Sequence, residues 1–172
     1  SKNLEKDFYN YAEYGINRVS IGMQSARNEE RFALGRSAGQ AEVKKAVFDA
    51  KAAGITNISL DVMLGTPKQS LASLEETFEF IDKVNVSHIS AYMLKIEEGT
   101  RFYDIKERLA LPNEDTVCEM YLKTISSLKS LGFNQYEISN FSKPSFESRH
   151  NTKYWILDDY LGLGKSAHSF WG

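Results

Sequence analysis

The chain has 172 residues, of which 42% are hydrophobic, and a formal net charge of −2 at pH 7, which is enough for one domain with a sizeable core. It has no run of five basic residues and no apolar stretch of eighteen, which disfavours nucleic-acid binding and a membrane-spanning helix. The first ten residues are polar and lack an initiator Met, and the single cysteine, Cys118, cannot form an internal disulfide. We therefore expect a cytoplasmic protein, and the missing Met indicates a piece of a longer chain.

Helical periodicity alternates with short strand-like stretches along the chain. Three of these stretches begin at glycine and resemble one another: 15–21, 54–60 and 132–138. The first two start 39 residues apart, the third starts 78 residues later, and the stretch 85–91 falls roughly in the skipped slot. Apolar residues recur at helical spacing ahead of the later stretches, over 43–53, 71–84 and 117–131.

Local residue choices mark the ends of these helices. Ser73 and Glu76 have the spacing of a capping box near the start of the second helix, and Gly54 and Gly132 stand where helix ends need a positive φ. Units of about forty residues in this order predict βαβ crossovers and a parallel sheet rather than a solenoid. The expected fold class is α/β.

The strand-like stretches predict a sheet with one apolar face and one polar face. Aligning the repeats superposes Ser20, Ser59 and Ser90, and side chains two positions apart along a strand share a face. The apolar residues of the second strand then meet the helices, namely Ile58, Leu60, Val62 and Leu64. The other face is small or polar, which favours the lumen of an open barrel over a doubly wound sheet covered on both faces.

Asp61 lies in the middle of this otherwise apolar strand. Together with Gln24 it is expected toward the carboxyl ends of the strands, where α/β sheets and barrels build their sites. Two interpretations are open on geometry alone. Asp61 binds a ligand, or it caps a neighbouring loop or pairs with a buried arginine.

Other motifs carry less weight. Gly162–Ser166 resembles the end of a phosphate-binding loop, but Asp159 stands where that pattern needs glycine. The histidines lack zinc-type spacing and no G-x-S-x-G stretch occurs, which disfavours zinc and serine hydrolases. His88 opens a strand and is interpreted as structural, and Cys118 is interpreted as a packing residue of an amphipathic helix.

Seven stretches follow one another from about Glu13 to the C-terminus: GINRVSIGMQS, LGR, NISLDVMLGTPKQ, HISAYMLKIEEGT, YEISNFSKP, ESRHNTKYW and YLGLGKSAHS. Together they resemble the radical S-adenosylmethionine (SAM) proteins related to oxygen-independent coproporphyrinogen III oxidase, with the HemW-type haem chaperones as the closest branch. The resemblance implies the C-terminal half of a partial (β/α)6 barrel over residues 1–111, with strands resembling the fourth to the sixth. Residues 112–172 then resemble the start of the C-terminal region of this family.

The resemblance also implies two cofactors. The family binds a [4Fe–4S] cluster through a C-x-x-x-C-x-x-C loop after the first barrel strand and SAM across the strand carboxyl ends. This chain has no such loop, so the cluster cysteines are expected upstream, and the fragment alone is expected to be inactive in radical chemistry. By position, the SAM contacts fall on Gln24, Arg36 and Asp61. Asp61 would accept hydrogen bonds from the ribose, Arg36 would pair with the SAM carboxylate and Gln24 would act as a neutral donor and acceptor.

The stretch HNTKYW resembles the H-N-x-x-Y-W motif of the haem chaperone branch. It implies that His150 ligates haem iron while Tyr154 and Trp155 stack on the macrocycle. The alternative for His150 is a loop anchor bonded to backbone, and His168 is a similar candidate.

The implied function is the binding of haem and its delivery to acceptor proteins. The alternative is oxidative decarboxylation of coproporphyrinogen III. Haem or a porphyrinogen is thus the expected small-molecule partner, and an incomplete barrel is expected to expose apolar edges through which two copies could pair.

Overall fold

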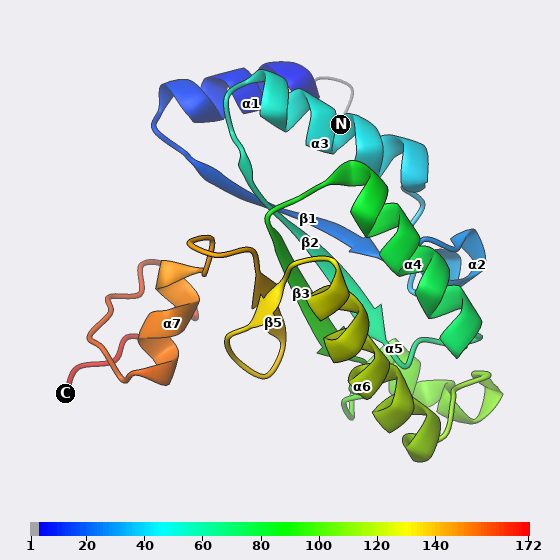
Figure 1. Ribbon diagram of the computed structural model, residues 1–172. Helices are drawn as coiled ribbons and strands as arrows, with labels where there is room; N and C mark the ends of the chain where they lie inside the picture. The colour runs from blue at the N-terminus through cyan, green and yellow to red at the C-terminus, as the bar shows by residue number, and fades with distance from the viewer. Residues whose placement is uncertain (1–3) are drawn as a thin grey trace.

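The computed structural model describes residues 4–172. An open sheet with helices over one of its faces makes up most of this part of the chain (Figure 1). The elements follow in the order α1 (Leu4–Glu13), β1 (Arg18–Gln24), α2 (Asn28–Ala33), α3 (Gln40–Ala52), β2 (Asn57–Leu64), α4 (Leu71–Val84), β3 (His88–Met93), α5 (Arg101–Asp104), the 3₁₀ helix η1 (Lys106–Arg108), α6 (Glu114–Ser130), β4 (Asn134–Gln135), β5 (Asn140–Ser142) and α7 (Arg149–Trp155).

The sheet has the strand order β1-β2-β3-β5-β4. β1, β2 and β3 are parallel to one another, which confirms the repeating units of helix, turn and strand. The expectation that 132–138 repeats them as a further strand is wrong. There the chain forms β4, two residues long, and turns back at once into β5, which pairs antiparallel with both β4 and β3.

The register of β1 on β2 agrees with the repeat alignment, because Ser20 pairs with Ser59. The register of β3 on β2 differs from it by two residues, since Ser59 pairs with His88 and Asp61 with Ser90. A displacement by an even number of residues leaves every side chain on its expected face. The two faces were therefore predicted correctly, whereas the neighbours across β3 were not.

Ser87 accounts for this register. Its N–H donates to the carbonyl oxygen of Ile58 at 3.2 Å, and its hydroxyl oxygen accepts from the Ile58 N–H at 3.0 Å. Both bonds are made just before β3 begins, so they place His88 beside Ser59. Residue similarity between repeats carries no information about this contact.

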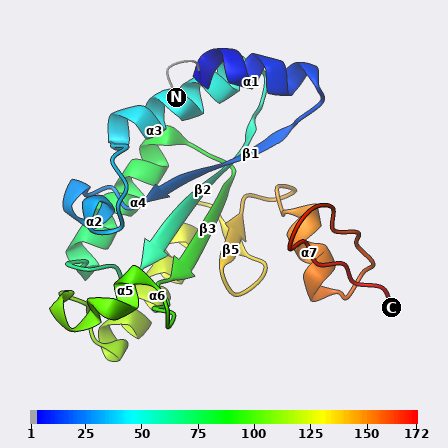
Figure 2. The same ribbon diagram turned by 180° about the vertical axis from the view of Figure 1, so that it is seen from behind.

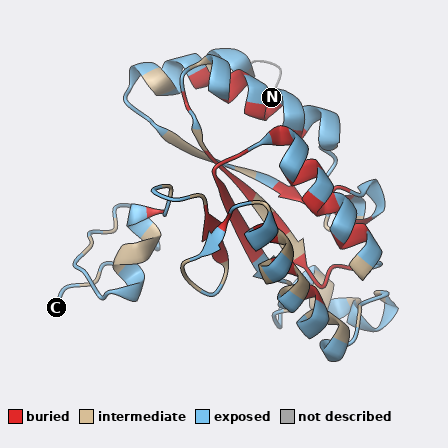
Figure 3. Cartoon of the chain, in the orientation of Figure 1, coloured by how far each residue is buried: buried red, intermediate tan, exposed pale blue. Residues whose placement is uncertain are grey.

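The helices α3, α4 and α6 cover one face of the sheet, and α1 packs on α3 (Figure 1). Seen from behind, the opposite face of β1, β2 and β3 has no helix over it (Figure 2). Burial follows this division: most of β2 and β3, all of β5 and the inner sides of the helices are buried, while α7 and the chain after it are largely exposed (Figure 3). Ile58, Leu60, Val62 and Leu64 are each at most 1% exposed, as expected, and burying such a side chain stabilises the fold by about 2 kcal/mol.

The helix ends follow the predicted glycines but not the predicted cap. Gly54 and Gly132 have φ of +87° and +85°. The capping box of α4 is formed by Ser70 and Ser73, not by Ser73 and Glu76: the Ser70 hydroxyl accepts from the Ser73 N–H, and the Ser73 hydroxyl accepts from the Ser70 N–H. Glu76 lies three residues beyond Ser73, the position that reaches back to the cap.

Two further expectations are corrected. The stretch around His150, expected as a loop, forms α7, whose N-cap Ser148 accepts a hydrogen bond from the Asn151 N–H at 3.4 Å. Cys118 lies on α6 as expected but is exposed rather than packed, because it lies off the buried side of the helix that carries Met120 and Leu128. None of the helices within residues 4–172 is long and apolar enough to cross a membrane.

Candidate functional site

Asp61 lies in the middle of β2, on the face of the sheet that no helix covers. Its Oδ1 accepts a hydrogen bond of 2.8 Å from Ser20 Oγ on β1. Asp61 takes part in none of the ion pairs of the described residues. A carboxylate accepts several hydrogen bonds, so this one keeps acceptor capacity toward the open face. The alternative in which Asp61 pairs with a buried arginine is therefore wrong.

Gln24 ends β1 with φ of +68°, a conformation that residues other than glycine seldom adopt. The register of β1 on β2 shifts between Gly22 and Gln24, which is the mark of a β-bulge. A Cβ added to Gly22 would lie 3.0 Å from Gln24 Nε2, so the amide folds back over Gly22. Gly22 pairs with Asp61, which places the Gln24 amide and the Asp61 carboxylate beside the same residue. Backbone strain of this kind clusters at ligand sites.

A buried polar cluster shapes the loop after β1. Arg31 is 1% exposed, and its guanidinium donates to the carbonyl oxygen of Ser25 at 2.5 Å and to Asn28 Oδ1. The Ser25 hydroxyl in turn donates to Glu30 Oε2 at 2.7 Å. Burial lowers the pKa of Arg31. This is the buried arginine of the region, and it holds the loop rather than Asp61.

Arg36 is exposed on the next part of this loop, between α2 and α3. Its backbone N–H donates to the Arg31 carbonyl oxygen at 2.9 Å, while its guanidinium has no hydrogen bond or ion pair within residues 4–172. The structure thus brings Gln24 and Asp61 together and leaves Arg36 on the adjoining loop, with its charge available to an anion. A polar ligand such as SAM fits this set of one carboxylate, one amide and one guanidinium.

A second polar network on the open face centres on His88, which is fully buried. Its Nδ1 lies 2.8 Å from Ser59 Oγ and its Nε2 lies 2.7 Å from Tyr136 Oη, which also accepts from the Ser148 N–H at 3.2 Å. Burial, reinforced by the positive charge of Arg18, lowers the pKa of His88 to about 4, so the imidazole is neutral at neutral pH. The network joins β2 and β3 to the chain before α7, which agrees with a structural role for His88.

His150 stands in the first turn of α7 and is exposed. Its Nε2 lies 2.7 Å from Tyr154 Oη one turn later, and the two rings meet edge to face at a centroid distance of 5.0 Å. The alternative of an anchor bonded to backbone is therefore wrong, since its partner is a side chain. His168, the similar candidate, lies in the exposed segment after α7.

An exposed apolar surface surrounds α7. Tyr154 packs edge to face on Tyr160 at 4.7 Å, and Tyr160 stacks on Phe170 at 6.3 Å, where the backbones also form an antiparallel bridge. Large apolar side chains project outward from the same segment: Trp155, Ile156, Leu157, Leu161, Leu163 and Trp171, each more than half exposed. Exposed patches of this kind mark binding surfaces, and this one suits a flat apolar ligand.

The residues of this chain do not fit a [4Fe–4S] cluster. Such a cluster needs several thiolates, and the sequence has only Cys118. The part of the chain that the structure describes also holds no group of three or more His, Cys, Asp and Glu residues placed to bind a metal ion. No step of cluster chemistry is assigned to these residues.

Two partners in these networks were missed by sequence reasoning. Ser20 is the hydrogen-bond donor to Asp61, and its side chain was predicted on the correct face, but a diagonal contact between strands depends on the register. Tyr136 bonds His88 from 48 residues further along the chain, and no local pattern identifies such a partner.

Comparison with known proteins identifies the relatives of this chain. The profile of the Radical SAM superfamily matches residues 2–81. The chain is 39% identical over 162 residues to the "Heme chaperone HemW" of Bacillus subtilis and 36% identical over 161 residues to that of Escherichia coli. It is 35% identical over 156 residues to the bovine "Radical S-adenosyl methionine domain-containing protein 1, mitochondrial". These alignments cover 93%, 94% and 90% of this chain but 43%, 42% and 35% of the relatives, so the chain spans less than half of their length.

The fold agrees as well. The coproporphyrinogen III oxidase HemN of Escherichia coli, described as a radical SAM enzyme, superposes with a TM-score of 0.81 at 19% identity, over 96% of this chain and 41% of the other. The open sheet thus has the fold of the corresponding part of that enzyme, and the chain belongs to the radical SAM proteins. Within that group its sequence is of the HemW type.

Proposed function

We propose that the protein binds haem and delivers it to acceptor proteins, as a SAM-binding member of the radical SAM proteins. The observation that carries this proposal is the exposed histidine on α7 within an exposed aromatic surface, in a chain 39% identical to a haem chaperone. Imidazole is a common axial ligand of haem iron, and aromatic side chains suit the faces of the macrocycle. We keep the division into a barrel part, 1–111, and a C-terminal part, 112–172, as part of this proposal, together with a cytoplasmic location.

In this proposal His150 is the iron ligand, and Tyr154 and Trp155 contact the macrocycle. In the structure the Tyr154 hydroxyl lies 2.7 Å from His150 Nε2. Ligation through Nε2 therefore requires the hydroxyl to leave, whereas ligation through Nδ1 leaves that hydrogen bond intact. Because both residues are exposed, moving the Tyr154 side chain costs little free energy.

The test is a haem titration of the protein at the full length that its gene encodes. His150→Ala should shift the Soret band and weaken haem binding by about tenfold or more, because the iron loses its axial ligand. His168→Ala is the matched control, since it removes another exposed histidine of the same segment. If the Soret band moves in His168→Ala and not in His150→Ala, the assignment of the ligand is wrong.

SAM is proposed to bind at Gln24, Arg36 and Asp61. When SAM and the cluster are both bound, radical SAM proteins use them for one-electron chemistry. The residues of this chain would hold the ligand: the Asp61 carboxylate accepts from its hydroxyls, Gln24 bonds its polar groups, and the Arg36 guanidinium meets its carboxylate.

Calorimetric titration with SAM tests this site. Asp61→Asn keeps the size of the side chain and should weaken SAM binding by about tenfold or more, because a charged acceptor is lost. Asp82→Asn, an exposed position on α4, is the control and should leave the affinity unchanged. Equal SAM affinity of Asp61→Asn and wild type would remove Asp61 from the site.

A second candidate function is the oxidative decarboxylation of coproporphyrinogen III. The structural likeness to HemN favours it, although that likeness alone carries only the fold. The full-length protein, with its cluster reconstituted, should convert no coproporphyrinogen III if the chaperone proposal is right. Turnover in this assay would decide for the oxidase.

A further inference from the structure

A polar pocket lies at the amino ends of β1 and β2, remote from Gln24 at the other end of β1. Its volume is about 420 Å³. Asn17 and Arg18 come from the start of β1, Asn57 from the start of β2, and the rest of the lining from the segment 145–150 that leads into α7. All eight lining residues are polar or charged, so the pocket does not suit an apolar ring.

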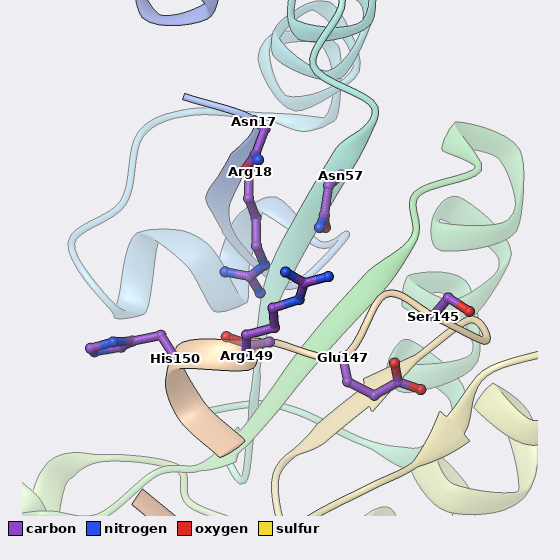
Figure 4. A pocket seen from close by; sticks show the side chains of 8 residues that line it. Asn17, Arg18, Asn57, Ser145, Glu147, Arg149 and His150 are labelled. Carbon is purple, nitrogen blue, oxygen red and sulfur yellow. The ribbon is translucent and has the colours of Figure 1, made fainter. Parts of the chain in front are cut away.

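Two arginines dominate the charge of this pocket. Arg18 and Arg149 both line it, against a single carboxylate, Glu147. In Figure 4 the two guanidinium groups end in the same space, while the Glu147 carboxylate points away from them. Neither arginine forms an ion pair within residues 4–172. Two like charges that converge without a counter-charge form a site for an anion.

An orphaned donor strengthens this conclusion. Arg18 Nε is buried and has no hydrogen-bond partner in the described part of the chain. A buried N–H without an acceptor is costly. The positive charge of Arg18 adds to the burial that lowers the pKa of His88, and it opposes the burial that raises the pKa of Tyr136. An oxygen anion in the pocket would satisfy this donor, and the planar fork of arginine suits a carboxylate.

The position of His150 identifies the kind of anion. His150 stands at the rim of the pocket, directly after Arg149, and in Figure 4 its imidazole points away from the guanidinium groups. A ligand that reaches both must therefore be extended, with an iron centre on one side of the start of α7 and carboxylates on the other. Haem has this form, since its two propionates project from one edge of the macrocycle.

We propose that Arg18 and Arg149 bind the propionate carboxylates of the haem whose iron His150 ligates. This inference rests on the proposed haem-binding function and adds the part of the site that orients the ligand. The propionates enter the polar pocket, and the macrocycle stays on the aromatic surface of α7 outside it. Haem would then bind at the opposite end of the sheet from SAM.

The experiment compares three porphyrins on the full-length protein: haem, its propionate dimethyl ester, and metal-free protoporphyrin IX. Arg18→Gln and Arg149→Gln should each weaken haem and metal-free protoporphyrin by about tenfold, since each loses a charged hydrogen bond. The Soret maximum of bound haem should stay in place, because the iron ligand is unchanged. Affinity for the dimethyl ester should change less than about twofold.

Arg108→Gln, at an exposed position in η1, is the matched control and should bind all three porphyrins like wild type. Arg18→Lys keeps the charge without the fork and should give an intermediate affinity, which guards against a folding defect in Arg18→Gln. Equal haem affinity of both Gln variants and wild type would overturn the proposal, as would an equal loss for haem and for its ester.

Failure of this inference is distinguishable from failure of the proposed function. If wild type binds haem through His150 and the arginine variants bind haem equally tightly, only the propionate assignment is wrong. If wild type binds none of the three porphyrins, both fall. The last measurement is the melting temperature in inorganic phosphate. If phosphate raises the melting temperature only when both arginines are present, and haem affinity is the same with and without them, the pocket is a site for a small anion and the propionate assignment is wrong.

Discussion

The stability of the protein should fall through His88 as the pH is lowered from about 7 to about 5. The pKa of His88 is lowered to about 4 by burial and by Arg18, whereas an unfolded chain has a histidine pKa of about 6.5. Between these values the unfolded state binds more protons than the folded state, so stability is fully present above about pH 6.5 and is lost as the pH falls toward 4. The linkage relation gives a loss of about 2 kcal/mol at about pH 5 and about 3 kcal/mol once both forms are protonated.

Urea unfolding followed by far-ultraviolet circular dichroism measures this effect in wild type and in His88→Gln. The variant lacks the titrating group, and its side-chain amide keeps a hydrogen-bond donor and an acceptor where the imidazole has them. The variant should therefore be less stable at neutral pH but lose about 2 kcal/mol less than wild type on acidification to about pH 5. Exposed carboxylates titrate equally in both proteins and cancel from the difference.

An equal loss of stability in wild type and His88→Gln would refute the reasoning. It would mean that the imidazole takes up its proton as readily in the folded state as in the unfolded state. Burial beside Ser59 and Tyr136 would then not lower the pKa of His88. A change in the dependence of the unfolding free energy on urea would instead report an altered unfolded state, so this slope is the control.

Three further predictions concern the haem surface, a helix cap and the core. Tyr154→Phe removes the hydroxyl that lies against His150 Nε2. If haem iron binds that nitrogen, the variant should bind haem up to about fivefold more tightly in a haem titration. Weaker haem binding would contradict the idea that the hydroxyl and the iron compete for Nε2. Ser70→Ala should lower the free energy of unfolding by about 1 kcal/mol in urea melts, and Glu76→Gln by clearly less, because Ser70 is the cap and the ion pair of Glu76 with Arg27 is exposed. Leu60→Ala, at a position with no exposure, should cost about 3 kcal/mol in the same assay, and a loss below about 1 kcal/mol would show that the sheet does not pack on the helices.

The helices α3, α4 and α6 and the parallel strands could be predicted because each follows from local periodicity. Val43, Val47 and Ala50 repeat at helical spacing and are buried on α3, and Gly54 ends the unit with a positive φ. The short β4 and β5 could not be predicted in this way. The stretch from Gly132 looks like the earlier strand units, yet it forms the edge strand β4, which pairs antiparallel with β5, and β5 in turn pairs antiparallel with β3.

The candidate sites divide in the same manner. The face that Asp61 shares with Ser20 followed from the two-residue period of a strand. Gln24, Arg36 and His150 came from resemblance to the radical SAM proteins, and their roles stay predictions. The backbone strain at Gln24, the hydrogen bond of His150 with Tyr154 and the convergence of Arg18 with Arg149 were not readable from spacing.

Local patterns in the sequence predict the α/β class, the helices α3, α4 and α6, the three parallel strands and the polar face of the sheet, because each depends on residues within one turn or a few positions of one another. The register of β3, the bond of His88 to Tyr136 and the pocket between the strand starts and α7 could be seen only in the folded chain. Each of these joins residues that are far apart in the chain, and their contacts depend on how the elements pack rather than on the residues that flank them.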